Sequence, residues 1–280
     1  NGLLLCCSDR GKEYKRKYYV FNPITKQFAV IPSIIGGPNA SRTIRFMCLA
    51  FHPLDFVHYK IVCFRKAKPR QNLVQIQIYS SDTGKWKILN QSFSSPCYLL
   101  SVGSGVYWNG AIHWAHTSLD PLYFKLDVEQ LQRLLLPERA ASSRGYDYIA
   151  MPLYFGESQG HLHLVERATH KSNLHLKVYE ALSDHSGWFL KYQVDLDELP
   201  LIYPLLVNQN QLNYEFKVLD VVRGEEEEDA FMVVKIPQKI IRYDILKKTF
   251  KEIFDLPNVL HHRRIGHEYV HRFTESLSSF

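Results

Sequence analysis

Residues 106–114 read Val-Tyr-Trp-Asn-Gly-Ala-Ile-His-Trp. Two short runs of aromatic and β-branched residues flank Asn109-Gly110, the dipeptide that best tolerates the positive φ angles of a two-residue hairpin turn. The stretch therefore predicts two antiparallel strands joined by a tight turn. Weaker hairpins of the same kind surround Gln159-Gly160, and join residues 216–219 to residues 231–234 through Gly224 and an acidic run at 225–229.

A second pattern repeats along the chain. An apolar strand ends in a small polar residue, a turn follows, and an aromatic residue opens the next strand. Three instances keep a separation of seven residues between aromatic side chains: Phe21 to Phe28, Tyr79 to Trp86, and Tyr243 to Phe250. Looser instances lie at residues 123–127 and 177–188, so the strand anchors recur every 47 to 64 residues. That is the length of a four-stranded propeller blade. We expect an all-β fold, a β-propeller of about five four-stranded blades, with six as the alternative.

The organisation of the chain follows from the same reading. No Ser/Gly-rich linker divides residues 1–280, so we expect a single domain. The chain opens with Asn1-Gly2 before an apolar strand at 3–6, which places its first residue inside a hairpin turn. The partner strand either lies upstream, or the C-terminal run 269–280 folds back and closes the propeller; both can hold. We expect no long helix, because Pro200 and Pro204 interrupt the apolar periodicity of 195–206.

Composition narrows the class of protein. There are 34 Lys and Arg against 28 Asp and Glu, with no long basic block and no readable nucleic-acid motif, so nucleic-acid binding is not favoured. Five cysteines without a CxxC pair sit mostly in apolar runs, which is typical of buried thiols in a reducing compartment. No apolar stretch reaches the ~18 residues of a membrane helix, and we expect a cytoplasmic or nuclear location.

A series of short motifs, in a fixed order, resembles the F-box-associated domain of plant F-box proteins. The motifs are residues 1–6 with 19–26, 50–53 with 59–62, 78–80 with Trp86, 106–114, 124–127 with 136–137, 216–218 and 269–273. The resemblance implies a kelch-like propeller that is not an enzyme and that selects target proteins for an SCF-type (cullin-RING) ubiquitin ligase. It also implies that a Skp-type adaptor and cullin are reached only through an F-box, which this sequence lacks. The double glycine of kelch repeats is absent too.

Candidates for chemistry are few. His161 and His163 share one face of an expected strand, but no third or fourth convergent ligand is evident, so we expect no metal and no cofactor. Residues 82–85, Asp-Thr-Gly-Lys, fit a hairpin turn better than a phosphate loop. His113 and Trp114 fit core positions. No motif marks a nucleophile, so no catalytic residue is assigned. The alternative function is a propeller enzyme or glycan-binding propeller that uses the mouth of the central channel.

The charge of the connections between strands is the remaining indication of a binding site. Connections from second to third strand leave a blade at one face, and four of the five expected ones are basic. The candidate substrate-binding residues on this face are Arg10, Lys15, Arg16, Arg65, Lys66, Lys68, Arg70, Arg167, Lys171 and Lys239. The acidic run 225–229 would lie at the opposite face. Either these are solvated hairpin tips, or they form an electropositive rim for an acidic or phosphorylated protein partner.

Overall fold

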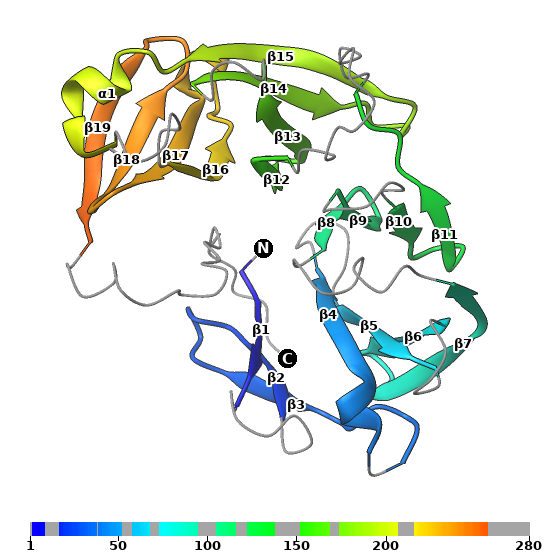
Figure 1. Ribbon diagram of the computed structural model, residues 1–280. Helices are drawn as coiled ribbons and strands as arrows, with labels where there is room; N and C mark the ends of the chain where they lie inside the picture. The colour runs from blue at the N-terminus through cyan, green and yellow to red at the C-terminus, as the bar shows by residue number, and fades with distance from the viewer. Residues whose placement is uncertain are drawn as a thin grey trace. The chain divides into compact units, whose positions relative to one another are not determined.

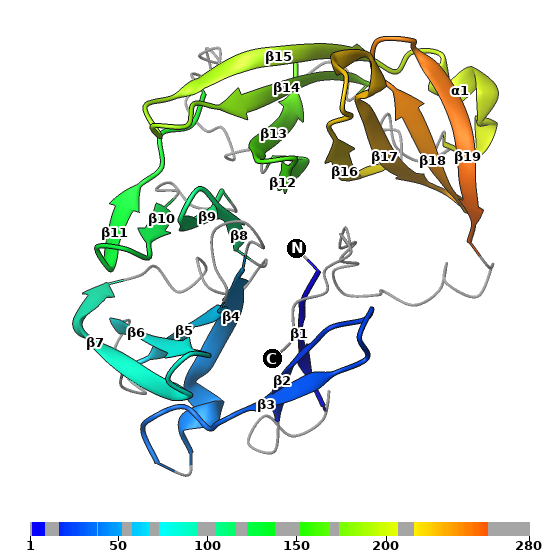
Figure 2. The same ribbon diagram turned by 180° about the vertical axis from the view of Figure 1, so that it is seen from behind.

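The structure is a computed structural model, and it describes residues 2–8, 17–37, 39–51, 58–67, 73–94, 105–115, 122–137, 152–168, 174–206 and 216–256. Within them the chain forms five antiparallel sheets (Figures 1 and 2), each a simple meander in sequence order. Four sheets have four strands, and the first has three in the part that the structure describes. The all-β, five-bladed propeller class predicted from the repeat is thus confirmed.

The strands follow the expected order. The first sheet holds β1 (Leu4–Cys7), β2 (Tyr18–Phe21) and β3 (Phe28–Ile31). The second holds β4 (Ile44–Ala50), β5 (Lys60–Lys66), β6 (Leu73–Ser80) and β7 (Lys85–Ser94). The third holds β8 (Val106–Trp108), β9 (Ala111–Trp114), β10 (Leu122–Lys125) and β11 (Gln130–Arg133). The fourth holds β12 (Tyr154–Ser158), β13 (His161–Arg167), β14 (His175–Ala181) and β15 (Trp188–Asp195). The fifth holds β16 (Lys217–Val222), β17 (Phe231–Ile236), β18 (Lys239–Asp244) and β19 (Thr249–Asp255).

The described residues fall into two compact units. The first ends at Leu134 and contains the first three sheets; the second starts at Leu135 and contains the fourth and fifth. Inside each unit the first strands of successive sheets contact each other, β4 with β8 and β12 with β16. Neighbouring blades of a propeller pack in this way, because their inner strands converge. That the whole chain is one domain stays a prediction.

The predicted hairpins form with the expected geometry. Asn109 and Gly110 have φ angles of 47° and 71°, so both adopt the left-handed conformation that a type I′ turn requires. Gln159 and Gly160 repeat it at 52° and 76°. Residues 82–85 turn from β6 into β7, and the amide of Gly84 donates to the Ser80 carbonyl at 3.0 Å. The hairpin-turn interpretation of that stretch is therefore confirmed.

The constant seven-residue spacing has a direct structural meaning. Its members are cross-strand partners in the hairpin between third and fourth strands: Phe21 pairs with Phe28, Tyr79 with Trp86, and Tyr243 with Phe250. In the fourth sheet the turn is longer, and Trp188 pairs with Ala181 instead. A cross-strand aromatic pair stabilises a sheet by about 0.2–1 kcal/mol relative to alanine. The repeat is thus the signature of one hairpin per blade.

Two tryptophans of this hairpin hydrogen-bond to the chain segment that precedes their own sheet. The indole Nε1 of Trp86, on β7, donates to the carbonyl of Pro32, directly after β3, at 2.8 Å. The indole of Trp188, on β15, donates to the carbonyl of Leu135, just after β11, at 2.6 Å. Both bonds join the outer strand of one sheet to the chain that leaves the preceding sheet. We call them the tryptophan latches.

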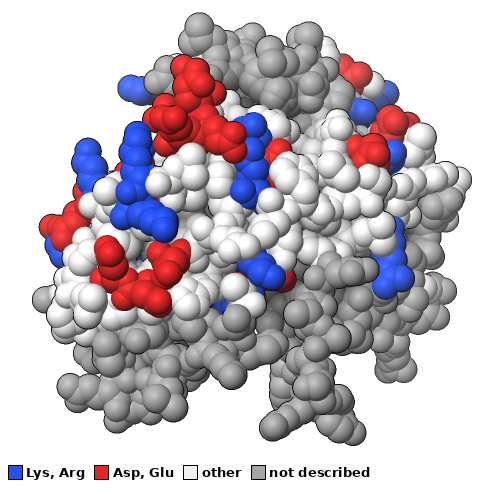
Figure 3. All heavy atoms as spheres, turned by 90° about the horizontal axis from the view of Figure 1, so that it is seen from above, with Lys and Arg blue, Asp and Glu red and all other residues white. Residues whose placement is uncertain are grey.

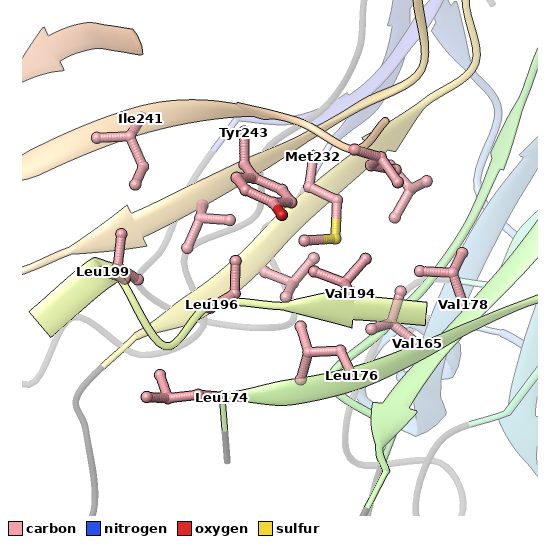
Figure 4. Packing of buried hydrophobic residues seen from close by; sticks show 14 of the residues in the cluster. Val165, Leu174, Leu176, Val178, Val194, Leu196, Leu199, Met232, Ile241 and Tyr243 are labelled. Carbon is pink, nitrogen blue, oxygen red and sulfur yellow. The ribbon is translucent and has the colours of Figure 1, made fainter. Parts of the chain in front are cut away.

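The core of the second unit lies between its two sheets. Figure 4 shows Met232 and Tyr243 of the fifth sheet directed toward Val194 and Leu196 at the end of the fourth. All four side chains are at most 3% exposed. The Tyr243 hydroxyl donates to the carbonyl of Asp195 at 3.1 Å, which satisfies its one polar atom. Apolar burial on this scale stabilises a fold by about 1.5–3 kcal/mol per large side chain.

The helical content is small. The structure describes one α-helical turn, α1 (Leu199–Ile202), and three 3₁₀ turns, η2 (Ala40–Thr43), η3 (Pro204–Leu206) and η4 (Glu227–Asp229). Pro200 does not prevent α1, because it lies in the first turn, where its missing N–H removes no helical hydrogen bond. Within the described part of the chain, no helix is long and apolar enough to cross a membrane. The predicted closing run 269–280 lies outside the described residues.

Candidate functional site

Four of the ten predicted binding residues are described: Arg65, Lys66, Arg167 and Lys239. Arg10, Lys15, Arg16, Lys68, Arg70 and Lys171 lie outside the described residues. The four are placed at the ends of second strands or the starts of third strands, as predicted from the loop analysis.

Arg65 does not belong to the exposed basic rim that the sequence predicted, because it is buried. Its residue surface is only 8% exposed, and its Nη1 donates to the carbonyl of Ile35, in the segment that follows β3. Gln77 holds the same residue on both sides, donating to that carbonyl at 2.8 Å and accepting from the Ile35 amide at 2.9 Å. A Cβ on Gly36 would collide with the Arg65 guanidinium. Arg65 therefore anchors a connecting segment on the second sheet and is not a surface contact.

Lys239 is half-buried, and its ammonium group is already paired. Its Nζ lies 2.8 Å from Asp255 Oδ1 and 2.7 Å from Glu252 Oε2. The hydrogen bonds with Asp255 and Glu252 raise the pKa of Lys239, so its charge is retained and locally balanced. Register explains the contact, because Lys239 at the start of β18 is the cross-strand partner of Asp255 at the end of β19.

Lys66 and Arg167 fit the predicted rim better. Lys66 ends β5 and is half-buried, and Arg167 ends β13 and is exposed. Among the described residues, no ion pair or hydrogen bond holds either side chain. Each remains a cation at the end of its sheet where the second strand turns into the third.

That end of the second unit is not uniformly basic. The connection that leaves a fourth strand emerges at the same end as the turn between second and third strands, and here it is acidic. Asp195 ends β15, Asp197 and Glu198 follow, and Asp255 ends β19. Figure 3 shows another side of the molecule, the one that lies uppermost in Figure 1, and there too acidic and basic side chains lie interspersed. The basic face therefore stays a prediction. The described part of this unit adds carboxylates at the same end, which the loop analysis left out because it counted only one of the two kinds of connection.

A buried polar cluster that the sequence did not reveal lies between the fourth and fifth sheets. Its centre is Glu180 on β14, which is 5% exposed. Arg223, just after β16, donates to Glu180 Oε2 at 2.9 Å, and His161 Nδ1 lies 2.7 Å from Oε1. His163 Nε2 lies 3.7 Å from Oε2. The two histidines do share one face of β13, as predicted, but they face a carboxylate and an arginine, which we call the Glu180 cluster.

The electrostatics of the Glu180 cluster fix its charge state. Burial raises the pKa of Glu180, but the contacts with His163, His161 and Arg223 outweigh it and bring that pKa from 4.5 to about 2. Arg223 is also held at its backbone, where its amide donates to the buried Ser158 Oγ at 2.8 Å. A carboxylate held this low is a poor proton acceptor near neutral pH. The Glu180 cluster is therefore better suited to holding the fourth and fifth sheets together than to acid–base chemistry.

Another group has the composition of a cation site. His175 Nε2 lies 2.9 Å from Asp197 Oδ2 and 3.6 Å from Asp195 Oδ1, and the three ligand atoms lie within 4.8 Å of one another. Asp195 and Asp197 are exposed, and His175 is half-buried. The hydrogen bond with Asp197 raises the pKa of His175, which favours an imidazolium paired with carboxylates. Ordinary ion pairing accounts for the group without a metal.

Five meandering sheets, inner strands in contact within each unit and the tryptophan latches place this chain in the class of β-propeller proteins. The model of one family within that class, the F-box protein At3g26010-like β-propeller, matches residues 1–214. The F-box protein At5g07610 of Arabidopsis thaliana is 30% identical over 297 aligned residues, which cover all of this chain and 69% of the relative. The chain belongs to this family of plant F-box protein propellers.

Solved structures match this chain at low identity. A prolyl endopeptidase is 12% identical, with a TM-score of 0.45, over 92% of this chain and 36% of that one. The β-propeller domain of the trilobed protease from Pyrococcus furiosus is 11% identical, with a TM-score of 0.44, over 90% of this chain and 65% of its own. A chain of the mitotic checkpoint complex is 8% identical, with a TM-score of 0.44, over 89% of this chain and 60% of that one. Likeness at this level carries no information on activity.

Proposed function

We propose that this chain is the substrate-recognition module of an SCF-type (cullin-RING) ubiquitin ligase, that it binds a target protein, and that it performs no chemistry itself. The observation that carries the proposal is membership of the F-box protein propeller family over residues 1–214. The Skp-type adaptor and cullin would be reached through an F-box outside this sequence. Such a protein would work in the cytoplasm, the nucleus or both.

The state of the polar groups supports a binding role. Enzymes keep acids, bases or nucleophiles poised at a site, with pKa values shifted toward the working pH. Here the pKa of Glu180 is lowered to about 2, away from neutrality, and that of the buried Cys63 thiol is raised to about 12, because burial outweighs the charge of Arg65. Neither group is suited to proton transfer or nucleophilic attack near pH 7.

The binding surface of the proposal is narrower than the sequence suggested. Arg65 and Lys239 are withdrawn as free contacts, since one is buried and the other is paired. The basic connections 9–17 and 65–72 follow β1 and β5 in the sequence, and Lys17 and Lys66 are described members of them besides the buried Arg65. We place the acidic or phosphorylated target there.

The test uses the natural full-length gene product, tagged and purified from plant cells under proteasome inhibition. We expect the Skp-type adaptor and cullin to co-purify, together with a target whose cellular half-life lengthens when the gene is removed. Recovery of neither adaptor nor cullin would rule out the ligase role.

A charge-reversed variant tests the surface separately. Lys66→Glu combined with Arg10→Glu, Lys15→Glu and Arg16→Glu should reduce target recovery about fivefold or more, while adaptor recovery stays unchanged. Lys85→Glu is the matched control, because Lys85 is exposed at the opposite end of the second sheet. Unchanged target capture at low salt would remove the basic connections from the proposal.

A further inference from the structure

An apolar surface of the second unit begins at α1 and η3. Leu199 and Leu206 are fully buried, and Tyr203 between them packs on the same core. Their spacing of four and three residues points one side of the segment inward. The intervening side chains therefore point outward, and Leu201 and Leu205 are 80% and 65% exposed.

The end of β19 extends this surface. Figures 1 and 2 draw α1 beside β19, and the Tyr203 hydroxyl hydrogen-bonds with Glu252 on that strand. The next two residues, Ile253 and Phe254, are 53% and 57% exposed. They lie where a bulge shifts the pairing with Ile240 and Ile241, and β19 is the outer strand of its sheet. We call Leu201, Ile202, Leu205, Ile253 and Phe254 the leucine face.

Exposed apolar side chains gather here from two segments, residues 201–205 and 253–254. Scattered apolar residues need no explanation, but a contiguous patch with a polar rim marks an interaction site. The leucine face has such a rim, and the rim is acidic. Residues 195–206 contain three carboxylates and no Lys or Arg, and the end of β19 adds Glu252 and Asp255.

The balance of charge around the face stays negative after its internal ion pairs are counted. His175 offsets part of the charge of Asp195 and Asp197, and Lys239 offsets part of that of Glu252 and Asp255. Glu198 is exposed directly before α1, with no ion pair among the described residues. Within residues 195–206 and 252–255 all the charged side chains are these five carboxylates, and the described ion pairs bring two cations, His175 and Lys239, to them. A partner that fits this surface must supply both apolar and positively charged side chains.

We propose that the leucine face binds a segment of a partner protein in which Leu, Ile or Phe side chains are flanked by Lys or Arg. This inference rests on the proposed substrate-binding role and adds a second recognition surface with the opposite charge preference to that of Lys66 and its neighbours. A second copy of this chain is a poorer occupant, because a symmetric contact brings carboxylates against carboxylates. An anionic membrane surface is repelled for the same reason.

The experiment titrates this chain with a fluorescein-labelled amphipathic peptide of about 15 residues, with Leu at i, i+3, i+4 and i+7 and Lys elsewhere. Its twin replaces every Lys by Glu. We expect the Lys peptide to bind about tenfold or more tightly than the Glu peptide by fluorescence anisotropy, with the difference shrinking as salt is added. Equal affinity of the two peptides would overturn the proposal.

Variants locate the binding. Leu201→Ser with Leu205→Ser should weaken binding of the Lys peptide about fivefold or more, and Glu198→Lys with Asp255→Lys should reverse the preference between peptides. The matched control is Val128→Ser with Leu246→Ser, which removes apolar side chains 52% and 49% exposed in turns between third and fourth strands. Because all these positions are exposed, melting temperatures should stay within about 2 °C of wild type. Equal loss of binding in the control would overturn the assignment.

Two further outcomes also decide the proposal. Dimerisation in sedimentation velocity that Leu201→Ser with Leu205→Ser abolishes would assign the face to a second copy and overturn it. Binding to anionic vesicles that the same variant abolishes would assign it to a membrane and overturn it as well. Failure of the peptide titration while adaptor and target still co-purify would remove only the leucine face. Loss of adaptor co-purification would remove only the ligase role.

Discussion

Replacement of Glu180 by Gln is expected to destabilise the second unit strongly. The amide keeps the shape of the side chain but removes the charge that Arg223 and His161 contact at 2.9 and 2.7 Å. Breaking a buried ion pair costs about 3–5 kcal/mol. The Arg223 side chain is 27% exposed and can regain water, which lowers the cost. A shift in the pKa of Glu180 from 4.5 to about 2 corresponds to about 3 kcal/mol, an upper bound on the same interaction.

Both estimates give a loss of about 2–3 kcal/mol in the free energy of unfolding for Glu180→Gln, which corresponds to a melting temperature about 5–10 °C lower. The assay is urea unfolding, with Glu129→Gln as the control. Glu129 holds Lys87 at 2.7 Å, but that pair is 32% and 65% exposed, so its loss should cost less than about 1 kcal/mol. If the two variants lose the same stability, the reasoning about burial is wrong.

A double-mutant cycle with Arg223→Met separates the pair from the rest of the cluster. We expect a coupling energy of about 1–2 kcal/mol between Glu180 and Arg223, since the two side chains are in direct contact. The pH dependence has a definite sign. Because the pKa of Glu180 is lowered in the folded state, its stabilisation is present above about pH 4.5 and is lost as the pH falls toward 2. The stability difference between wild type and Glu180→Gln should shrink over that window; a constant difference would contradict the assignment.

Two other predictions concern the latches and the thiols. Trp188→Phe deletes the 2.6 Å hydrogen bond to the Leu135 carbonyl and should lower the free energy of unfolding by about 1 kcal/mol, or the melting temperature by about 2–4 °C. Phe suits this position, because Phe250 occupies the equivalent place in the hairpin of the fifth sheet. An unchanged melting temperature would mean that the latch contributes nothing to stability. Iodoacetamide should label the exposed Cys7 in the native protein. It should reach Cys63 only after unfolding, because burial raises the pKa of that thiol to about 12. Mass spectrometry that finds comparable labelling of both cysteines in the native protein would contradict the buried position of Cys63.

The sequence alone predicted about five blades, with six as the alternative, and it determined the hairpins and the family resemblance. Each of these depends on local chemistry repeated along the chain. Asn109-Gly110 specifies its turn through backbone conformation, and the spacing of Tyr79 and Trp86 is set by the length of one hairpin. Such features involve residues close in sequence, so the pattern exposes them.

Only the tertiary structure decided what the charged residues do. Arg65 is basic and lies next to a loop, yet it is buried because Ile35, 30 residues earlier, presents a carbonyl to it. Glu180 and Arg223 meet across 43 residues, and no local spacing announces that contact. Whether Leu201 is exposed depends likewise on which side of α1 packs against the core. A side chain's charge can be read from its name, but its partners come from segments distant in sequence, and those segments are placed only when the sheets pack.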